Sequence, residues 1–383
     1  MNASGWPPPP PRPAAPEETC SQLAASGHSR LIVLHYNHSG RAAGRAGPED
    51  ALRGPLAAVG GLVVLGNLLV LAALATRLRA RRWVHVCLAN VALSDLLTGG
   101  AYLANVLLSG PRTPRLAPAH WFLREGLLLA ALAASALSLL LTAAERLATM
   151  ARPWRAAEAR AARRSRVLGL AGACWLLAAL LGLLPALGWN CVCAFERCSR
   201  LLPLYSRSYV GFCLALFACA LAAVLGLYAA IVRLARAGGA PRRPKARRLL
   251  RTVVLILAAF AVCWGPLLAL LLADALGAGL QAHVRGRSWT LALAVANSAV
   301  NPLIYTCRSR ELRRAVLGLL CAGCLRLGLR GPGDCLRAAT EPPSASASAT
   351  DSSLRPGDSF RGSRSLSFRM REPLASVSSV KST

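Results

Sequence analysis

Charged side chains are scarce in this 383-residue chain, at 16%, whereas hydrophobic side chains make up 55%. A soluble domain of this length would carry more charge and less apolar surface. Acidic residues are the scarcer kind, 16 against 45 Lys and Arg, but the formal charge of +29 is concentrated in particular segments. The charge therefore does not form the even basic coat of a nucleic-acid-binding protein, and the composition indicates an integral membrane protein.

Patterns that other classes of membrane protein need are also missing. The six histidines do not stand in a nucleophile or metal-binding constellation, so neither an enzyme nor a cofactor is expected. Internal repeats with paired broken helices are not found, which makes a membrane transporter only a remote alternative. The chain opens with Trp6 and a proline run instead of a basic stretch and an apolar core, so we predict no cleavable signal peptide. The first hydrophobic segment is then expected to direct membrane insertion.

What the sequence does contain is a series of long apolar runs. A helix needs about 20 mostly apolar residues to cross a bilayer core of about 30 Å. Runs of that kind are expected to form helices at residues 56–76, 83–108, 124–150, 167–189, 209–232, 252–273 and 288–307. They predict an all-α membrane protein, a seven-transmembrane helix bundle over residues 52–307.

The loops between these runs differ in their content of arginine. Residues 77–82, 152–166 and 233–251 are dense in Arg, whereas the loops on the other side hold fewer cations. Because short cytoplasmic loops retain positive charge, residues 1–51 are predicted to form an extracellular tail of a multi-pass cell-membrane protein. Asn2 and Asn37 begin Asn-x-Ser sequences in that tail and are candidate glycosylation sites.

Two further segments follow the seventh run. Residues 308–324 place cations on one face and apolar residues on the other, which predicts an amphipathic eighth helix on the inner membrane surface. Cys321 and Cys324 are candidate palmitoylation sites there, the alternative being two inert cysteines. Residues 325–383 are rich in Ser, Pro, Gly and Arg, so we predict a disordered cytoplasmic tail. Its serines beside arginines are candidate targets of receptor kinases and, through them, of arrestin; the alternative is a plain solubilising tail.

A polar cluster is predicted inside the bundle. Asp95 lies near the middle of the second run, where a carboxylate costs about 2.5–3.5 kcal/mol unless it finds partners. The polar residues at matching depths on other runs are Asn67, Ser135, Asn297 and Asn301. Such a cluster can hold a sodium ion at Asp95 and Ser135 and shift between two arrangements; the alternative is a static packing network.

Three short motifs occur at expected depths on successive runs. Glu145-Arg146 ends the third run, residues 263–266 (Cys-Trp-Gly-Pro) interrupt the sixth, and residues 301–305 (Asn-Pro-Leu-Ile-Tyr) close the seventh. A proline inside a helix removes a backbone hydrogen bond and bends the helix. The anchor residues Asn67, Asp95, Arg146, Trp175, Trp264, Pro266 and Pro302 give residues 52–321 a resemblance to the rhodopsin class of G-protein-coupled receptors.

That resemblance implies an activation mechanism. The sixth helix would swing outward and open an inner cleft, lined by Arg146, for a heterotrimeric G protein. The residues expected to act as the activation switch are Asp95, Ser135, Glu145, Arg146, Trp264, Asn297, Asn301 and Tyr305. Leu147 departs from the class because an aromatic residue usually follows Glu-Arg. The start of the sixth helix offers no acidic partner for Arg146, so no ionic latch is expected there.

The outer mouth carries a cation and an anion side by side, Arg124 and Glu125. The guanidinium of Arg124 presents a fork of donors suited to a phosphate, and Glu125 accepts from an ammonium, so the pair suits a zwitterion. Asn105 is expected to face them. The alternative is an interfacial pair that only anchors the depth of the helix.

Residues 31–41, 102–105, 121–126 and 188–191 resemble the sphingosine 1-phosphate receptors. The resemblance implies that Tyr36, Arg41 and Arg124 hold the phosphate and that Glu125 and Asn105 hold the amine and hydroxyl. It implies an apolar pocket below, including Trp264 and Leu271, for the lipid tail. Expected partners are sphingosine 1-phosphate, membrane lipid and G proteins of the Gi class, with the twelve/thirteen class second. The alternative ligand is lysophosphatidic acid, which lacks the ammonium that Glu125 favours.

The same resemblance implies a disulfide inside the second outer loop. That family lacks the usual cysteine at the outer end of the third helix, and here none occurs between Cys87 and Cys174. Cys191 and Cys198 occupy the places of the family's loop disulfide, with Cys193 as a competing partner. Cys20 remains without an assigned partner.

Overall fold

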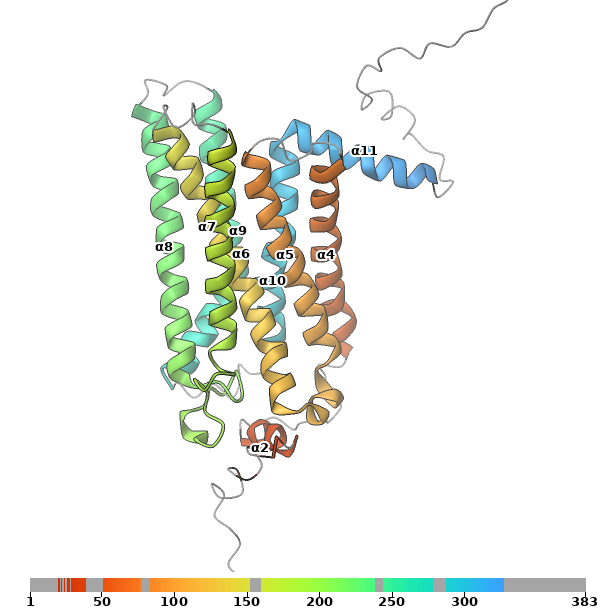
Figure 1. Ribbon diagram of the computed structural model, residues 1–383, viewed down its shortest axis with the longest axis vertical. Coiled ribbons are helices and arrows are strands. Elements are labelled where there is room, and N and C mark those ends of the chain that lie inside the picture. The colour runs from red at the N-terminus through yellow and green to blue at the C-terminus, as the bar shows by residue number, and fades with distance from the viewer. Residues whose placement is uncertain are drawn as a thin grey trace, which may run out of the picture. The chain divides into compact units, whose positions relative to one another are not determined.

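The computed structural model describes residues 20, 22, 24, 26–27, 29–38, 51–76, 83–151, 160–237, 244–277 and 287–326 (Figure 1). Its seven long helices are α4 (Arg53–Thr76), α5 (Trp83–Leu107), α6 (Pro118–Ala151), α7 (Arg160–Leu183), α8 (Arg207–Ala237), α9 (Pro244–Ala275) and α10 (Arg287–Arg308). All seven contain a stretch long and apolar enough to cross a membrane. The predicted fold class, a seven-transmembrane helix bundle, is confirmed.

The helix ends differ from those read off the hydropathy. α6 begins at Pro118 and α7 at Arg160, each before the apolar run that marked it, because a helix continues through polar turns beyond the membrane core. α7 ends at Leu183 and not at Trp189, since Pro185 cannot continue the backbone hydrogen-bond pattern. The third helix therefore carries Trp121 as part of the same rigid rod as Arg124.

The bundle is held together by polar contacts as well as by apolar packing. α5 packs against α4, α6 and α10, and α6 packs in addition against α7 and α8 (Figure 1). Trp175 of α7 donates from Nε1 to Asn90 Oδ1 at 2.9 Å, and Asn90 of α5 donates to Ser138 Oγ of α6 at 2.8 Å. Because unmet polar groups are costly in lipid, this chain of bonds fixes how the three helices are rotated.

α6 and α7 approach closely at a pair of glycines. A Cβ atom built on Gly126 would overlap the carbonyl oxygen of Gly182, and a Cβ on Gly182 would overlap that of Gly126. Only residues without a side chain allow the two backbones to come this near. Gly126 directly follows Glu125, so the contact fixes the part of α6 that carries the charged pair.

The predicted eighth helix is present as α11 (Arg310–Arg326), shown in blue in Figure 1. Its apolar face buries Leu312 and Ala315 against Val70 and Leu74 of α4. Cys321 is half-buried near its end. The side chain of Cys324 and all residues after 326 lie outside the described part of the chain.

The outer tail contains a helix that the sequence reading missed. α2 (Arg30–His38) was assigned to a plain extracellular tail, but it buries Leu31, Ile32 and His35. Leu31 and Ile32 pack with Trp121 and Tyr205, which lie on α6 and on the second outer loop. Nine residues are too few for a helix to be stable alone in water, so the stability of α2 comes from this docking.

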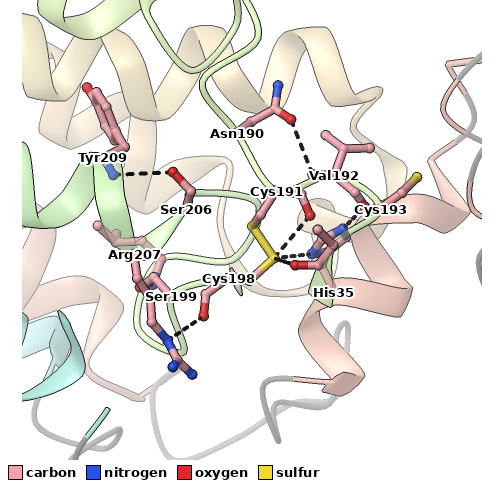
Figure 2. Close-up of a disulfide and its surroundings, with 12 residues drawn as sticks. His35, Asn190, Cys191, Val192, Cys193, Cys198, Ser199, Ser206, Arg207 and Tyr209 are labelled. Carbon is pink, nitrogen blue, oxygen red and sulfur yellow. Dashed lines mark hydrogen bonds between the residues drawn. A yellow bond between two sulfur atoms is a disulfide. The ribbon is translucent and has the colours of Figure 1, made fainter. Parts of the chain in front are cut away.

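Two disulfides among the described residues lie at the end of the bundle that carries α2. Cys191 is bonded to Cys198 within the second outer loop, the pairing that the family resemblance implied. Cys193 is instead bonded to Cys20, across 173 residues of sequence. In Figure 2 the sulfur of Cys193 points away from the Cys191–Cys198 bond. The second bond ties the segment before α2 to the loop and gives Cys20 its partner.

Replacing Cys20 with serine is expected to loosen α2 and lower the melting temperature of the purified receptor. A crosslink that closes a long loop typically contributes about 2–4 kcal/mol. Hydrogen exchange of residues 30–38 should become faster, because the helix is then held by noncovalent contacts alone. The matched control is Cys219→Ser, which removes an exposed free thiol. Equal melting temperatures for both variants would contradict a stabilising role.

Candidate functional site

The charged pair of α6 lies inside the protein. Arg124 and Glu125 are each only 7% exposed. Arg124 Nη2 donates to Glu125 Oε1 at 2.7 Å, and Arg124 Nη1 donates to the carbonyl oxygen of Leu108 at 3.0 Å. Both side chains leave the first turns of α6, whose outer end is fixed by the contact of Gly126 with Gly182. A snorkelling pair would point into water, so the alternative of a depth anchor does not fit this geometry.

Other predicted headgroup residues converge on this pair. Asn105 of α5 donates from Nδ2 to Glu125 Oε1 at 3.0 Å. Tyr36 of α2 accepts a hydrogen bond from Trp121 Nε1 at 3.3 Å, and its hydroxyl interacts with Arg124. Arg41 lies outside the described residues. Tyr36, Asn105, Arg124 and Glu125 are thus brought together from three helices.

Arg124 and Glu125 neutralise each other's charge. Burying two charges is costly unless each finds a partner with good geometry, and here each is the other's partner. Arg124 Nε is nevertheless buried without a hydrogen-bond partner among the described residues. A ligand with an anionic and a cationic group can replace the ion pair between Arg124 and Glu125 by two ion pairs, one between its anion and Arg124 and one between its cation and Glu125.

An apolar cavity of about 240 Å³ extends from Glu125 into the bundle. Its walls come mainly from α6, α8 and α9, and Trp264 and Leu271 are among them, as predicted. Trp264 is part of an aromatic stack, with its ring centroid 4.5 Å from that of Phe217 and 5.7 Å from that of Phe260. A polar end joined to an apolar chamber fits an amphiphile with one hydrocarbon chain.

His35 of α2 lies against the second outer loop, beside the Cys191–Cys198 disulfide (Figure 2). It is 2% exposed, and its Nε2 donates to the carbonyl oxygen of Val192 at 2.6 Å. Nδ1 lies 3.7 Å from Cys198 Sγ. His35, Cys191 and Cys198 lie close enough to hold a metal ion, but the two sulfurs share a disulfide and offer no thiolate. The cluster is therefore a structural contact between α2 and the loop.

Lowering the pH is expected to weaken the docking of α2. Burial lowers the pKa of His35 from 6.5 to about 4, with the Val192 hydrogen bond opposing the shift and the neighbouring His38 adding to it. Between pH 6.5 and about 4, His35 binds a proton when α2 is undocked but stays neutral when α2 is docked. Docking stability is full above pH 6.5 and is lost as the pH falls toward 4, by up to about 3 kcal/mol.

The measurement is hydrogen exchange of residues 30–38 as a function of pH, corrected for intrinsic exchange. Exchange should accelerate as the pH falls below 6.5. His35→Gln retains an N–H donor but does not titrate, so its corrected exchange should be flat. Identical pH profiles for the two proteins would rule out His35 as the titrating group.

The polar cluster around Asp95 differs from the prediction, since two of the four expected partners, Ser135 and Asn301, bond to the carboxylate and Asn67 is linked to it only through Ser298. Asp95 is fully buried; Ser135 and Ser298 donate to Oδ1 at 2.6 and 2.8 Å, and Asn301 donates to Oδ2 at 2.8 Å. Asn67 donates to the carbonyl oxygen of Ser298 at 3.0 Å. Asn297 makes no hydrogen bond to Asp95. Its neighbour Ser298 faces the carboxylate because successive residues of a helix point about 100° apart.

At the inner end of α6, Glu145 is paired with α7. Arg166 Nη2 lies 3.2 Å from Glu145 Oε2. Glu145 and Arg146 form no ion pair with each other among the described contacts, and Arg146 lies within electrostatic range of Tyr228 and Tyr305. Leu147 packs near Tyr228, against the small cluster at the inner end of α8. The ion pair at this end of the bundle is therefore between α6 and α7, which the sequence did not indicate.

Comparison with known proteins gives consistent matches. Residues 66–305 match the model of the 7 transmembrane receptor (rhodopsin family). The chain is 67% identical over the full length of both proteins to sphingosine 1-phosphate receptor 4 of Homo sapiens. It is 47% identical to sphingosine 1-phosphate receptor 5 of Sus scrofa over 77% of this chain and 79% of the relative. For sphingosine 1-phosphate receptor 1 of Danio rerio the identity is 38%, over 77% and 86%.

Proposed function

This chain belongs to the rhodopsin family of seven-transmembrane receptors and, within it, to the sphingosine 1-phosphate receptors, and we propose that sphingosine 1-phosphate is its activating ligand. It is a multi-pass membrane protein and a receptor, not an enzyme. The observation that carries the ligand proposal is the buried Arg124–Glu125 pair at the polar end of an apolar cavity. The opposite charges of the pair match those of a zwitterionic headgroup.

In the proposed complex each part of the lipid meets a separate group. Arg124, Tyr36 and Arg41 bind the phosphate, since a guanidinium forks onto phosphate oxygens. Glu125 accepts from the ammonium, and Asn105 meets the hydroxyl. The hydrocarbon chain enters the cavity that contains Trp264 and Leu271. Lysophosphatidic acid has a phosphate but no ammonium, so it would leave Glu125 buried without a cation.

Ligand binding is proposed to shift the bundle between two states. Trp264, which lines the cavity, and Pro266 lie on α9, and the proline leaves α9 able to bend. Asp95 and Ser135 hold a sodium ion in the resting state; the carboxylate and hydroxyl oxygens there are the ligand type that such hard cations take. Glu145, Arg146, Asn297, Asn301 and Tyr305 complete the switch on the inner side.

The proposed partners lie inside the cell, with the N-terminus outside. The inner cleft binds heterotrimeric G proteins of the Gi class and, second, of the twelve/thirteen class. The tail, residues 325–383, is phosphorylated by receptor kinases and then binds arrestin. Asn2 and Asn37 carry glycans, and Cys321 and Cys324 carry palmitate. Of these four residues, Asn37 is exposed on α2 and Cys321 is half-buried on α11, whereas Asn2 and the Cys324 side chain lie outside the described residues.

The test is nucleotide exchange on a purified Gi heterotrimer in the presence of the receptor in vesicles. Sphingosine 1-phosphate should accelerate exchange in a saturable manner, and lysophosphatidic acid should act only at much higher concentration. Vesicles without receptor are the control. No acceleration by either lipid would overturn the ligand proposal.

A further inference from the structure

A second, smaller cavity continues the first one deeper into the bundle. It has a volume of about 30 Å³ and lies between α6, α8 and Phe260 of α9. Ala136, Phe217 and Ala220 line both cavities, so these residues form the boundary between them. The two alanines come from facing positions on α6 and α8, and their small side chains leave the boundary narrow but apolar.

The occupant of this space can be argued from its chemistry. Among the residues that the structure describes, no charged side chain lines the second cavity, and Glu125 is the one charged side chain that lines the first. A polar occupant would lose its hydrogen bonds there, whereas a hydrocarbon chain gains from leaving water. The first cavity starts at Glu125, so a chain attached to a headgroup at that residue runs directly toward Ala136 and Ala220.

The residues around the boundary between the two cavities can also accommodate the end of a hydrocarbon chain. α7 and α8 each pack against α6 but make few contacts with each other along their described lengths. Leu177 of α7 and Leu216 of α8 line the first cavity and are exposed toward the lipid. The inner part of the cavity is therefore bounded by side chains that can shift without breaking polar contacts.

We propose that the space between α6 and α8 beyond Ala136 and Ala220 is the subsite for the terminal carbons of the ligand's hydrocarbon chain, and that these two alanines set the longest chain the receptor accepts. The inference rests on the proposed function, since it takes the headgroup to lie at Arg124 and Glu125. A volume of 30 Å³ accommodates about one methylene or methyl group, the space of one water molecule in the liquid. Leucine at either position would fill it.

The experiment measures binding of sphingoid base 1-phosphates that lengthen in two-carbon steps, by competition with radiolabelled sphingosine 1-phosphate in receptor membranes. Ala136→Leu and Ala220→Leu should weaken the longest chains by about fourfold relative to the shortest, because the space holds about one methylene group and an excluded methylene is worth about fourfold. Leu221→Ala should shift the preference toward longer chains, since Leu221 lines only the second cavity. This enlarging variant provides a test even if a leucine variant fails to fold.

The matched control is Ala218→Leu, on the same helix but exposed to lipid and in neither cavity. It should leave the dependence on chain length unchanged. If the leucine variants weaken every chain equally, the alanines have only a structural role and the subsite proposal is wrong. If the wild type binds no member of the series, the proposed function fails and the subsite fails with it.

Discussion

Replacing Arg124 with alanine is expected to abolish the response to sphingosine 1-phosphate, with a loss of affinity of at least about 100-fold. Each hydrogen bond between a guanidinium and a phosphate is worth about 1.5–3 kcal/mol, and the fork of Arg124 makes two of them. The substitution also leaves Glu125 buried without its cation, which repels the phosphate further. The measurement is competition binding together with nucleotide exchange on the G protein.

Stability must be separated from binding in this experiment, because breaking a buried ion pair costs about 3–5 kcal/mol. The double variant Arg124→Met, Glu125→Gln removes both charges, so it should regain surface expression but not ligand affinity. Arg112→Ala is the matched control, since Arg112 is an exposed outer arginine that donates a hydrogen bond to the carbonyl oxygen of Leu107. Near-normal affinity in a well-expressed Arg124→Ala receptor would contradict the proposal that the headgroup binds at Arg124.

Replacing Glu125 with glutamine is expected to shift the ligand preference from sphingosine 1-phosphate toward lysophosphatidic acid. Glutamine has the size of glutamate but no charge, so the ammonium of sphingosine 1-phosphate loses its partner and affinity falls by about 10- to 100-fold. Lysophosphatidic acid should gain, because the anion that opposed its phosphate is gone and Arg124 is no longer neutralised by a neighbour. The ratio of the two half-maximal concentrations in the exchange assay measures the effect.

Asn105→Ala is the comparison for this second substitution. It removes the other hydrogen bond to Glu125 Oε1 but keeps the carboxylate charge. Both lipids should weaken slightly, by about fivefold, with little change in their ratio. If Glu125→Gln also shifted both lipids equally, charge recognition of the ammonium would be excluded, although Arg124 would keep its role.

Features with a strong chemical requirement could be predicted from the sequence. A bilayer demands about 20 apolar residues per helix, so the seven spans followed from hydropathy alone. A carboxylate in lipid demands partners, which located Ser135 and Asn301 around Asp95. The adjacent charges Arg124 and Glu125 were recognised from the sequence as a candidate site, and they are in contact with each other; their binding of a zwitterion stays a prediction.

Features that depend on docking could not be predicted. The sequence of α2 does not by itself indicate a helix. The helix is stable because Leu31, Ile32 and His35 are buried against a loop that is far away in sequence. Four cysteines on the outer side allow three pairings, so the family resemblance implied one bond and left the partner of Cys20 open. Similarly, only the rotation of α10 decides that Ser298 and not Asn297 reaches Asp95.

The pair of Glu145 with Arg166 shows the same limit at the inner face. The sequence indicated that the start of the sixth helix has no acidic residue to pair with Arg146. It did not indicate which cation would pair with Glu145. The structure links it to α7, at the end of the Arg-rich second inner loop. Sequence distance conceals this contact, since Glu145 and Arg166 are 21 positions apart.

The touching backbones at Gly126 and Gly182 make affinity vulnerable to changes at residues that are not expected to meet the lipid. A single methyl group at either glycine would force α6 and α7 apart. The residue just before Gly126 would then turn away from the ammonium. An alanine variant at either glycine is expected to reach the cell surface but to respond only to excess lipid. Screening for faulty receptors by inspecting cavity-lining positions alone would overlook it.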